Sequence, residues 1–522
     1  MNAATNADLQ GSSPAAFLPG RIATFWGVAG VVALYRLAFT IAIAIAAPPL
    51  GMDNIADNVW AQHLRLVYQL RQPPLFEWLL WPVQRLVGPS ALSFLIVKDV
   101  LVVLAAAFLF GAARTAIRDR RMAAIAVFSY ALYYNIAWTM LERLTQSSLL
   151  LCCCAATAWT FARALQNRRA LDYAFVGLAV GAGLLAKFNF ALFALALIAA
   201  AVSEPSLRRR LRLGGMAIAA AVAAAVVSPY LYGLVAGDQP LVASAVNIMQ
   251  AGAKAPYLAR TATGLGLLAL SLAEFSLVLA PAAAIAFWKP IRSGALTSDD
   301  DFAAFARMYG KTSLIAAAIA VIGVVVTGSI YIRDWHVLPA FVTAPLWLFA
   351  RIERGGVSPL RLKLWTFGVA AVVIACALIR AVAELAPDAG FCGHCGALKP
   401  YPALAQDIRR LGGADATLIG LDAYTAGNLR AQLPQARILM ADFRAPEPTG
   451  PERPCFAVWE VEGPPASLEQ RLTAAGYSPA NLQGAGPEEI VTHFWRRQWL
   501  SGFGRSTTWG IRRLSPAAPA CR

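Results

Sequence analysis

The sequence predicts a helical membrane protein that ends in a small α/β domain. Of its 522 residues, 58% are hydrophobic and only 14% are charged. A chain of this composition has more apolar surface than its own cores can bury, so lipid must cover the rest. From residue 388 onward the composition changes, and Pro, Gly and charged residues alternate with short apolar runs. We therefore predict an all-α polytopic region followed by a separately folded domain.

The first twenty residues are polar and lack the basic region of a signal peptide, so we interpret 1–20 as a disordered cytoplasmic tail. A helix needs roughly 20 apolar residues to cross about 30 Å of hydrocarbon. We predict about eleven such spans within 21–387. They are 22–47, 91–112, 122–141, 145–165, 171–187, 189–204, 214–236, 263–288, 312–332, 335–350 and 364–386. The second span contains Lys98 and Asp99, which we expect to neutralise one another.

The distribution of basic residues predicts the orientation. The net charge is +16, but Lys and Arg occur in short clusters in alternate loops rather than on one domain, which excludes a nucleic-acid partner. Loops rich in Lys and Arg stay in the cytoplasm. This rule places the first loop, 48–90, and the tail, 388–522, on the periplasmic side of a bacterial inner membrane. We expect a multi-pass protein whose active site faces the periplasm.

The tail has the pattern of an α/β domain, because strand-like and helix-like segments alternate. We predict helices over 401–411, 424–432 and 467–475, and strands over 417–421, 437–441 and 456–461.

The cysteines fall into two groups. Cys152, Cys153, Cys154 and Cys376 are in apolar spans, where they act as small hydrophobic residues, and Cys392, Cys395, Cys455 and Cys521 are in the tail. The run Cys392-Gly-His-Cys395 matches the redox motif of disulfide isomerases, but it follows a membrane span. We favour a structural disulfide between Cys392 and Cys395 over redox catalysis, with a Cys-Cys-His zinc site as a third alternative.

The first loop has two interpretations. Its apolar residues Ile55, Val59, Leu64, Leu66 and Val67 are typical of an amphipathic helix lying on the bilayer. Its acids, Asp53 and Asp57, favour a second interpretation, in which Asp53 faces a cavity at the membrane surface and acts as a base.

The same loop contains a spaced run of polar and aromatic residues: Asp53, Trp60, Gln62, His63, Leu64, Tyr68, Gln72, Pro73, Pro74 and Trp78. This run resembles the first external loop of family-39 glycosyltransferases. These are membrane enzymes of the GT-C fold, akin to protein O-mannosyltransferases, the lipid A aminoarabinose transferase and bacterial lipopolysaccharide galacturonosyltransferases. That family usually opens the loop with two acids and closes it with His-Pro-Pro, whereas this chain has Asp53-Asn54 and Gln72-Pro73-Pro74.

The resemblance implies an inverting glycosyltransferase that moves a sugar from a polyprenyl-phosphate donor to a lipid, lipopolysaccharide or other envelope glycan. Such a reaction needs a base for the acceptor hydroxyl and cations for the departing phosphate. The resemblance gives the base role to Asp53. Many family members carry a second acid where this chain has Ser147, so Asp57 and Glu142 are the other catalytic candidates.

Three cations are candidates for binding the donor phosphate: Lys187, Arg333 and Arg260. The run Gly183-Leu-Leu-Ala-Lys187 resembles a Gly-Leu-x-x-Lys segment of the family, although a Lys at a helix end can also simply reach the interface. Arg333-Asp-Trp-His336 resembles a basic-Trp patch, and the alternative is an ordinary surface Arg-Asp pair. Arg260 ends the segment 237–261, a lid or a plain connection.

The predicted substrate-binding residues are Gln62, His63, Tyr68, Gln72 and His336. No P-loop, dinucleotide fingerprint, His-Glu-x-x-His run or nucleophile elbow occurs, which excludes a nucleotide-sugar donor. We assign no cofactor and leave a divalent metal open. The expected partners are the polyprenyl-phosphate sugar, the lipid or glycan acceptor and the membrane. The alternative function is a transporter or flippase for a lipid-linked sugar, although the internal repeat common in transporters is not visible.

Overall fold

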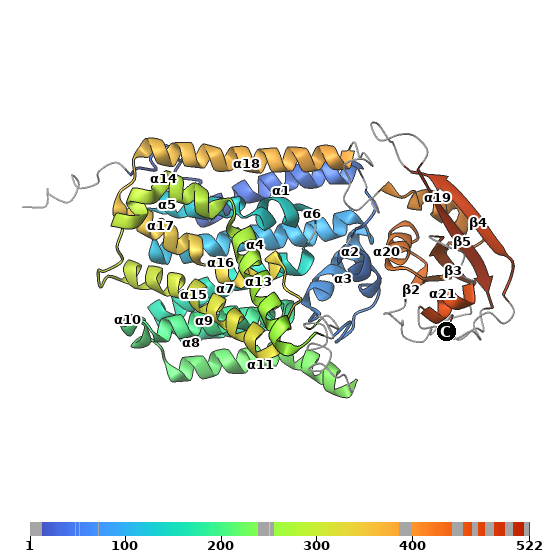
Figure 1. Ribbon diagram of the computed structural model, residues 1–522, viewed down its shortest axis with the longest axis horizontal. Helices are drawn as coiled ribbons and strands as arrows, with labels where there is room; N and C mark the ends of the chain where they lie inside the picture. Colours follow the sequence, from blue (N-terminus) through green and yellow to red (C-terminus); the bar gives the residue numbers. More distant parts are fainter. Residues whose placement is uncertain are drawn as a thin grey trace, which may run out of the picture. The chain divides into compact units, whose positions relative to one another are not determined.

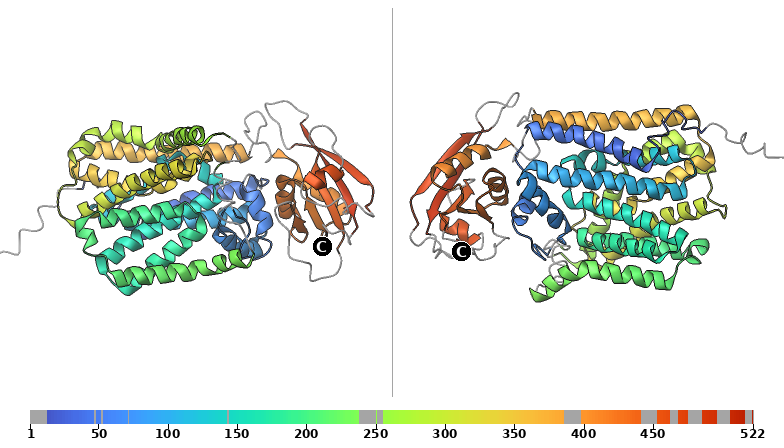
Figure 2. Two further views of the ribbon diagram at one scale, coloured as in Figure 1. Left: turned by 60° about the horizontal axis from the view of Figure 1, so that its bottom comes forward. Right: turned by 180° about the vertical axis from the view of Figure 1, so that it is seen from behind.

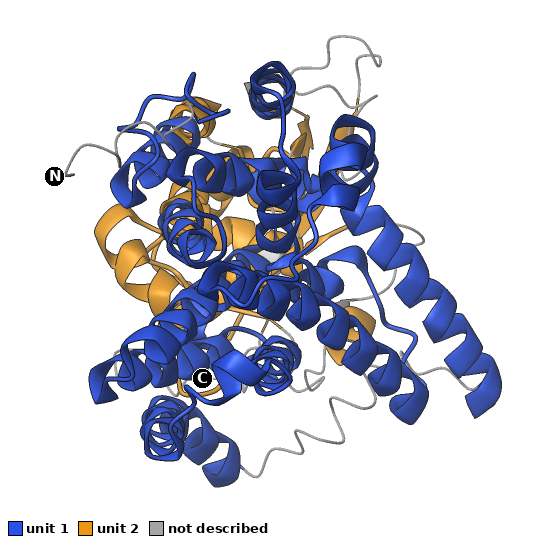
Figure 3. Ribbon diagram, turned by 90° about the vertical axis from the view of Figure 1, so that its left-hand side faces the viewer, with its two compact units in different colours: residues 1–37, 69–76, 98–377 blue, residues 38–68, 77–97, 378–522 orange. Residues whose placement is uncertain are grey.

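The computed structural model describes residues 13–46, 48–51, 53–70, 72–142, 144–237, 250, 255–385, 398–440, 453–461, 468–474, 485–495, 505–515 and 521. The chain divides into two compact units, which Figure 3 draws in different colours. Unit 1 comprises residues 1–37, 69–76 and 98–377. Unit 2 comprises residues 38–68, 77–97 and 378–522, so the tail shares a unit with most of the first loop.

Long apolar helices running side by side make up most of unit 1 (Figures 1 and 2). The first and second, α1 and α4, run on into unit 2. The helices are α1 (Phe25–Ala46), α4 (Ala91–Ala116), α5 (Arg120–Phe128), α6 (Met140–Glu142), α7 (Thr145–Asn167), α8 (Ala170–Ala186), α9 (Phe190–Val202), α10 (Pro205–Arg208), α11 (Leu213–Ala236), α13 (Tyr257–Ser276), α14 (Leu279–Ser293), α15 (Asp301–Thr327), α16 (Leu338–Phe341), α17 (Ala344–Gly355) and α18 (Pro359–Leu385). Three further turns are η1 (Ser129–Leu132), η2 (Asn135–Thr139) and η3 (Asp334–Val337).

The polytopic helical class is confirmed, but the spans are fewer than the eleven predicted. Within the described residues, seven helices are long and apolar enough to cross a membrane, or eight if the bent pair 334–341 and 344–355 is one span. The segment 122–141 is broken into α5, η1, η2 and α6. The segment 263–288 is split into α13 and α14, and Pro281, early in α14, has no N–H to continue a helix through this point.

A buried ion pair in unit 1 joins the first two long helices. The carboxylate of Asp99 on α4 accepts a hydrogen bond from Nε of Arg36 on α1 at 2.6 Å, and Arg36 is buried. Asp99 therefore pairs with a residue of a neighbouring helix, and the predicted neutralisation of Lys98 by Asp99 stays a prediction.

Unit 2 contains a mixed sheet with the strand order β2-β1-β3-β5-β4. Its strands are β1 (Thr417–Gly420), β2 (Arg437–Leu439), β3 (Cys455–Glu460), β4 (Glu488–Phe494) and β5 (Ser506–Leu514). The first three are parallel, β5 is antiparallel to β3, and β4 is antiparallel to β5. The α/β prediction is confirmed, although β4 and β5 were not predicted.

Helices cover both faces of this sheet, because side chains alternate between faces along each strand. On one face, Leu418, Ile438 and Phe456 pack with residues of α19 (Tyr401–Arg410) and α20 (Ala423–Gln432). On the other, Ile419 and Trp459 pack with Leu472 of α21 (Leu468–Ala474) and with Cys521.

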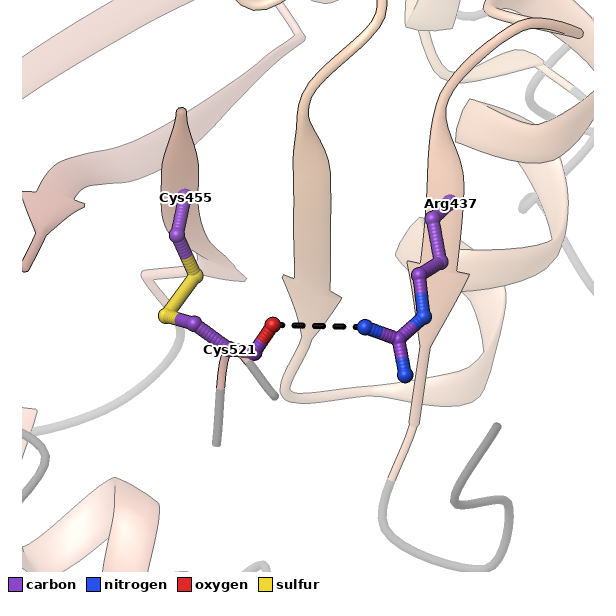
Figure 4. The surroundings of a disulfide bond; sticks show 3 residues. All are labelled: Arg437, Cys455 and Cys521. Carbon is purple, nitrogen blue, oxygen red and sulfur yellow. Dashed lines mark hydrogen bonds between the residues drawn. A yellow bond between two sulfur atoms is a disulfide. The ribbon is translucent and has the colours of Figure 1, made fainter. Parts of the chain in front are cut away.

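A disulfide lies on the face of the sheet that packs against α21. Cys455 at the start of β3 is bonded to Cys521, and Nη1 of Arg437 donates to the carbonyl of Cys521 at 3.2 Å (Figure 4). The two bonds hold the end of the chain against the sheet. Cys392 and Cys395 lie outside the described residues, so their disulfide stays a prediction. Cys152, Cys153 and Cys154 are buried in α7 as free thiols, in agreement with the sequence.

Candidate functional site

The short helix α2 (Asp53–Trp60) packs on the tail domain through α20. A Cβ atom at Gly427 would lie 2.7 Å from Cα of Ile55, so only glycine permits this approach. Val59 and Trp60 join the buried core on the α20 face of the sheet. This packing corrects the interpretation of α2 as a helix on the bilayer, because protein covers its apolar side.

Hydrogen bonds fix α2 and the chain before it to α20. The side-chain amide of Asn428 accepts from the N–H of Leu50 at 2.7 Å and donates to the Leu50 carbonyl at 3.0 Å. The amide of Asn58 donates to the carbonyl of Gly427 at 2.8 Å and accepts from Nε2 of Gln84 at 2.7 Å. Gln84 is on α3 (Leu75–Val87). All three amide side chains are buried, which makes these bonds specific for one arrangement.

Gln62 extends the sheet edge with its side chain. Its Oε1 accepts from the N–H of Ile438, and its Nε2 donates to the carbonyl of the same residue, each at 2.9 Å. Nε2 also donates to the carbonyl of Val59 at 2.8 Å. Because β2 is an edge strand, Gln62 satisfies backbone groups that another strand would otherwise bind. These contacts favour a structural role, and contact of Gln62 with substrate stays a prediction.

The two acids of the loop are both on α2. Asp53 is its first residue, but its side chain is outside the described part of the chain. Asp57, one turn later, is buried. The predicted catalytic roles of Asp53, Asp57 and Glu142 stay predictions.

The remainder of the first loop is held by its own aromatic residues. The hydroxyl of Tyr68 donates to the carbonyl of His63 at 2.9 Å and accepts from the N–H of Arg65 at 3.1 Å. Trp78 donates to the carbonyl of Arg65 at 2.7 Å. Burial raises the pKa of Tyr68 to about 12, so its hydroxyl keeps its proton at neutral pH. Gln72, in unit 1, has a buried amide oxygen with no hydrogen-bond partner among the described residues.

In unit 1, Lys187 occupies the turn between α8 and α9. The turn is tight because Gly183 lets the ring of Phe190 pack directly on α8, where a Cβ atom would collide with it. The ammonium of Lys187 donates to the hydroxyl of Ser147 at 3.1 Å. A neutral acceptor orients the ammonium without cancelling its charge.

His336 and Arg333 lie near Lys187, and we call these three residues the cation site. The positive charges of Lys187 and Arg333 both act on the imidazole of His336. The N–H of Arg333 donates to Nδ1 of His336 at 3.2 Å, while Nδ2 of Asn189 donates to the His336 carbonyl at 2.9 Å. The structure thus brings together two of the cations and one of the substrate-binding residues named from the sequence.

Two asparagines beside the cation site were missed by the sequence analysis. Asn189 is two residues after Lys187, and Asn135 on η2 donates to the carboxylate of Asp334 at 3.0 Å. The amide oxygens of both are buried and have no hydrogen-bond partner within the described chain. A buried unpaired oxygen is a place where a ligand or water donates. Neither asparagine belongs to a motif, so only the fold could identify them.

Arg260, the third predicted phosphate ligand, is in the first turn of α13. Its Nη2 would lie 3.6 Å from a Cβ atom at Gly328, whose φ of +61° ends α15. The chain then runs from Gly328 to Arg333, so Arg260 borders the segment that leads into the cation site. Its Nε is buried and has no hydrogen-bond partner among the described residues.

The segment before Ser147 is irregular. The π turn η2 is followed by the three-residue helix α6, which ends at Glu142, and Leu144 has φ 60° and ψ 50°. A left-handed leucine costs on the order of 1–3 kcal/mol, and such strain is concentrated at functional sites. The side chain of Glu142 lies outside the described part. Among the residues that the structure describes, no three His, Cys, Asp or Glu side chains could hold a metal ion together.

Comparison with known proteins places this arrangement in a family. The family described as dolichyl-phosphate-mannose-protein mannosyltransferase matches residues 71–232. The lipopolysaccharide core galacturonosyltransferase RgtB of Rhizobium johnstonii is 30% identical over 449 residues, which are 85% of this chain and 88% of RgtB. RgtA of the same organism, also a lipopolysaccharide core galacturonosyltransferase, is 27% identical over 90% of this chain and 95% of its own length.

Two solved structures share the fold. ArnT from Cupriavidus metallidurans bound to undecaprenyl phosphate matches with a TM-score of 0.57 at 14% identity, and covers 94% of this chain and 99% of its own. The same protein in the apo state matches with a TM-score of 0.53 at 16% identity, with the same coverage. Together with the 30% identity to RgtB, these findings show that the chain is a membrane glycosyltransferase of the GT-C fold and belongs to the family that contains RgtA and RgtB.

Proposed function

We propose that this enzyme transfers galacturonate from a polyprenyl-phosphate donor to a sugar of the lipopolysaccharide core. The observation that carries the proposal is the cation site, in which the charges of Lys187 and Arg333 both act on His336. Two asparagine oxygens beside it have no hydrogen-bond partner among the described residues. The names of RgtA and RgtB supply the sugar and the acceptor, and the ligand of ArnT supplies the class of carrier.

The chemistry divides between an acid and the cations. Asp53 removes the proton of the acceptor hydroxyl, whose oxygen forms a bond to the anomeric carbon. The bond from that carbon to the phosphate oxygen breaks on the opposite side, and the electron pair leaves with the carrier phosphate. The anomeric configuration is therefore inverted.

The departing phosphate requires compensation, since it develops negative charge near the membrane. Fixed cations that already point at that position stabilise the transition state without reorganisation. Lys187 and Arg333 supply two such charges. The ammonium of Lys187 donates a hydrogen bond to the neutral hydroxyl of Ser147, which fixes its position.

We place the reaction at the periplasmic face, from the excess of Lys and Arg in alternate loops. In this orientation the first loop and the tail are outside the cytoplasm. A reporter that functions only in the cytoplasm, fused after Arg522, should be inactive. An active reporter would reverse the orientation.

The donor is tested with purified protein in detergent and deacylated core oligosaccharide as acceptor. We expect transfer from polyprenyl-phosphate galacturonate and none from nucleotide-linked galacturonate. Lys187→Met should lower turnover by about 100-fold, the effect of removing one stabilising group from an anionic transition state, and raise the KM for the donor. Lys363→Met, on α18, is the matched control and should have little effect. Equal use of the nucleotide-linked donor would refute the proposal.

A further inference from the structure

Unit 2 gathers four arginines and one histidine around the junction of the first loop with the tail domain. We call them the arginine cluster: His63, Arg65, Arg85, Arg430 and Arg437. His63, Arg65 and Arg85 come from the first loop, the last of them from its helix α3. Arg430 on α20 and Arg437 on β2 are far from that loop in the sequence.

Hydrogen bonds already described set the positions of these residues. The pairing of Gln62 with Ile438 puts the next loop residue, His63, beside Arg437 at the start of β2. The cluster therefore includes the sheet edge.

Asn58 brings the other two elements to the same junction. It is bonded to Gly427, one turn before Arg430 on α20, and to Gln84, the residue before Arg85 on α3. The fold therefore holds the backbones that carry these arginines in fixed positions.

The charges of the cluster act on one another. Burial lowers the pKa of His63, and Arg65, Arg437, Arg430 and Arg85 lower it further, so the imidazole is neutral at pH 7. Burial and the charge of Arg85 lower the pKa of Arg430 to about 10. Arginines that repel one another destabilise the fold unless an anion compensates them.

For two members of the cluster, Arg85 and Arg430, the described residues provide no carboxylate. Neither Arg85 nor Arg430 forms an ion pair with any carboxylate in the described chain, and Nε of Arg430 is buried with no hydrogen-bond partner there. By contrast, Arg410 on α19 is paired with both Asp407 and Glu489 at 3.1 Å. Among the described residues, Arg85 and Arg430 thus have no carboxylate partner, whereas Arg410 of the same unit has two.

We propose that the arginine cluster binds a phosphate or carboxylate group on a sugar of the acceptor glycan. This inference rests on the proposed function, in which that glycan is the acceptor. It adds that the enzyme recognises the acceptor by its negative charge. Guanidinium groups bind phosphate and carboxylate through two parallel hydrogen bonds. Cζ of Arg85 lies over the ring of Trp81, 5.3 Å from the ring centroid, in a cation–π contact.

The cluster is also accessible, as an acceptor site must be. Arg85 is exposed, and the other four members are half-buried. A group that is partly desolvated binds an anion more strongly than a fully hydrated one, because the local dielectric is lower.

The test measures binding to the full-length protein in detergent, without any transfer. The probe is deacylated lipopolysaccharide core oligosaccharide, compared with the same oligosaccharide after removal of its phosphates and reduction of its carboxyl groups. We expect Arg85→Gln with Arg430→Gln to weaken binding of the anionic probe by about 10- to 100-fold, for two lost charge-assisted contacts. Arg410→Gln should bind as the wild type does. In transfer assays the double variant should raise the KM for the acceptor and not that for the donor.

Several results would overturn the proposal. One is equal binding of the anionic and neutralised probes by wild type. Another is unchanged affinity in the double variant. A third is tighter binding to phosphatidylglycerol vesicles than to the oligosaccharide, which would assign the cluster to membrane lipid. If the double variant melts at a lower temperature, the exposed Arg85→Gln alone replaces it, with about a 10-fold effect. The binding assay does not depend on catalysis. If the wild-type protein binds the anionic probe but transfers no galacturonate, the proposed function is refuted and the binding proposal is not.

Discussion

The cation site of unit 1 and the first loop in unit 2 are built in different ways. The position of Lys187 is determined by a turn of a few residues between two apolar helices. Its hydrogen-bond partner Ser147 is 40 residues away in the sequence. The first loop is set by Asn58, Gln62 and Asn428, whose bonds join residues 369 to 378 positions apart. In unit 2 a soluble domain, rather than lipid, determines the conformation of the loop that carries Asp53.

The two regions should therefore differ in the amino-acid substitutions that they tolerate. A helix hairpin keeps its turn as long as its apolar faces stay packed, so changes at Lys187 should affect chemistry alone. The first loop depends on buried amides and on one glycine, so changes far along the chain, in α20 or β2, should affect Asp53. Substitutions can therefore distinguish the effect of the charge of the base from the effect of the stability of the domain that holds it.

The largest effect should come from the base itself. Asp53→Asn keeps the shape of the side chain and removes its basicity, and general-base assistance supplies about a hundred- to ten-thousand-fold in rate. We expect turnover to fall within this range with little change in the KM for either substrate. The measurement is transfer to core oligosaccharide under saturating conditions.

Asp57→Asn is the matched control, because Asp57 is on the same helix and buried. If Asp57→Asn loses turnover and Asp53→Asn does not, the base is one helical turn further along. If both remain active, neither acid of α2 takes part in the chemistry.

Much of the fold follows from the sequence because local patterns determine it. Apolar runs gave α1, α4, α7, α11 and α18 near their observed bounds, and the alternating tail gave β1, β2, β3 and their helices. The short motifs around Lys187 and Arg333 are each contiguous, and the charges of both residues act on His336. Their binding of phosphate stays a prediction.

What the sequence could not predict depends on long-range contacts or on helix breaks. The apolar side of α2 has the same pattern whether lipid or protein covers it, so only the fold distinguishes the two. The pair Arg36–Asp99 joins two helices, and no spacing within either helix indicates it. The strand β4 was missed because it is an edge strand without a buried face, and β5 because it carries polar residues such as Thr508, which is hydrogen-bonded to Thr492 of β4.

The second prediction concerns the sheet face away from α2. The disulfide Cys455–Cys521 closes a segment with a sequence separation of 66, and cross-linking a segment of this length stabilises a fold by about 4 kcal/mol in the chain-entropy account. Cys455→Ala with Cys521→Ala should lower the melting temperature of unit 2 and make it insensitive to reductant. Transfer at low temperature should persist, because α2 packs on the other face.

Cys376→Ala provides the control, since this half-buried cysteine is on α18 and forms no disulfide. A double variant that melts like wild type would show that the bond adds no stability. Loss of transfer in a double variant that remains folded would show that the two faces are coupled.

The smallest effect should come from Gly427→Val, and it tests the docking of α2 directly. Valine is a better helix former than glycine, so the change should stabilise α20 by itself by a few tenths of a kcal/mol. In the assembled unit, however, the new Cβ would lie 2.7 Å from Cα of Ile55, and overpacking of this kind costs about 1–3 kcal/mol. The two terms have opposite signs, and the clash is the larger. We expect the tail domain to stay folded while α2 leaves α20, which should make the first loop sensitive to protease and lower turnover without changing the KM for the donor.

Gly486→Val is the matched control in the same unit, because its Cβ would meet nothing closer than 3.7 Å. Protection of the loop that is equal in both variants would mean that α2 is held by something other than α20.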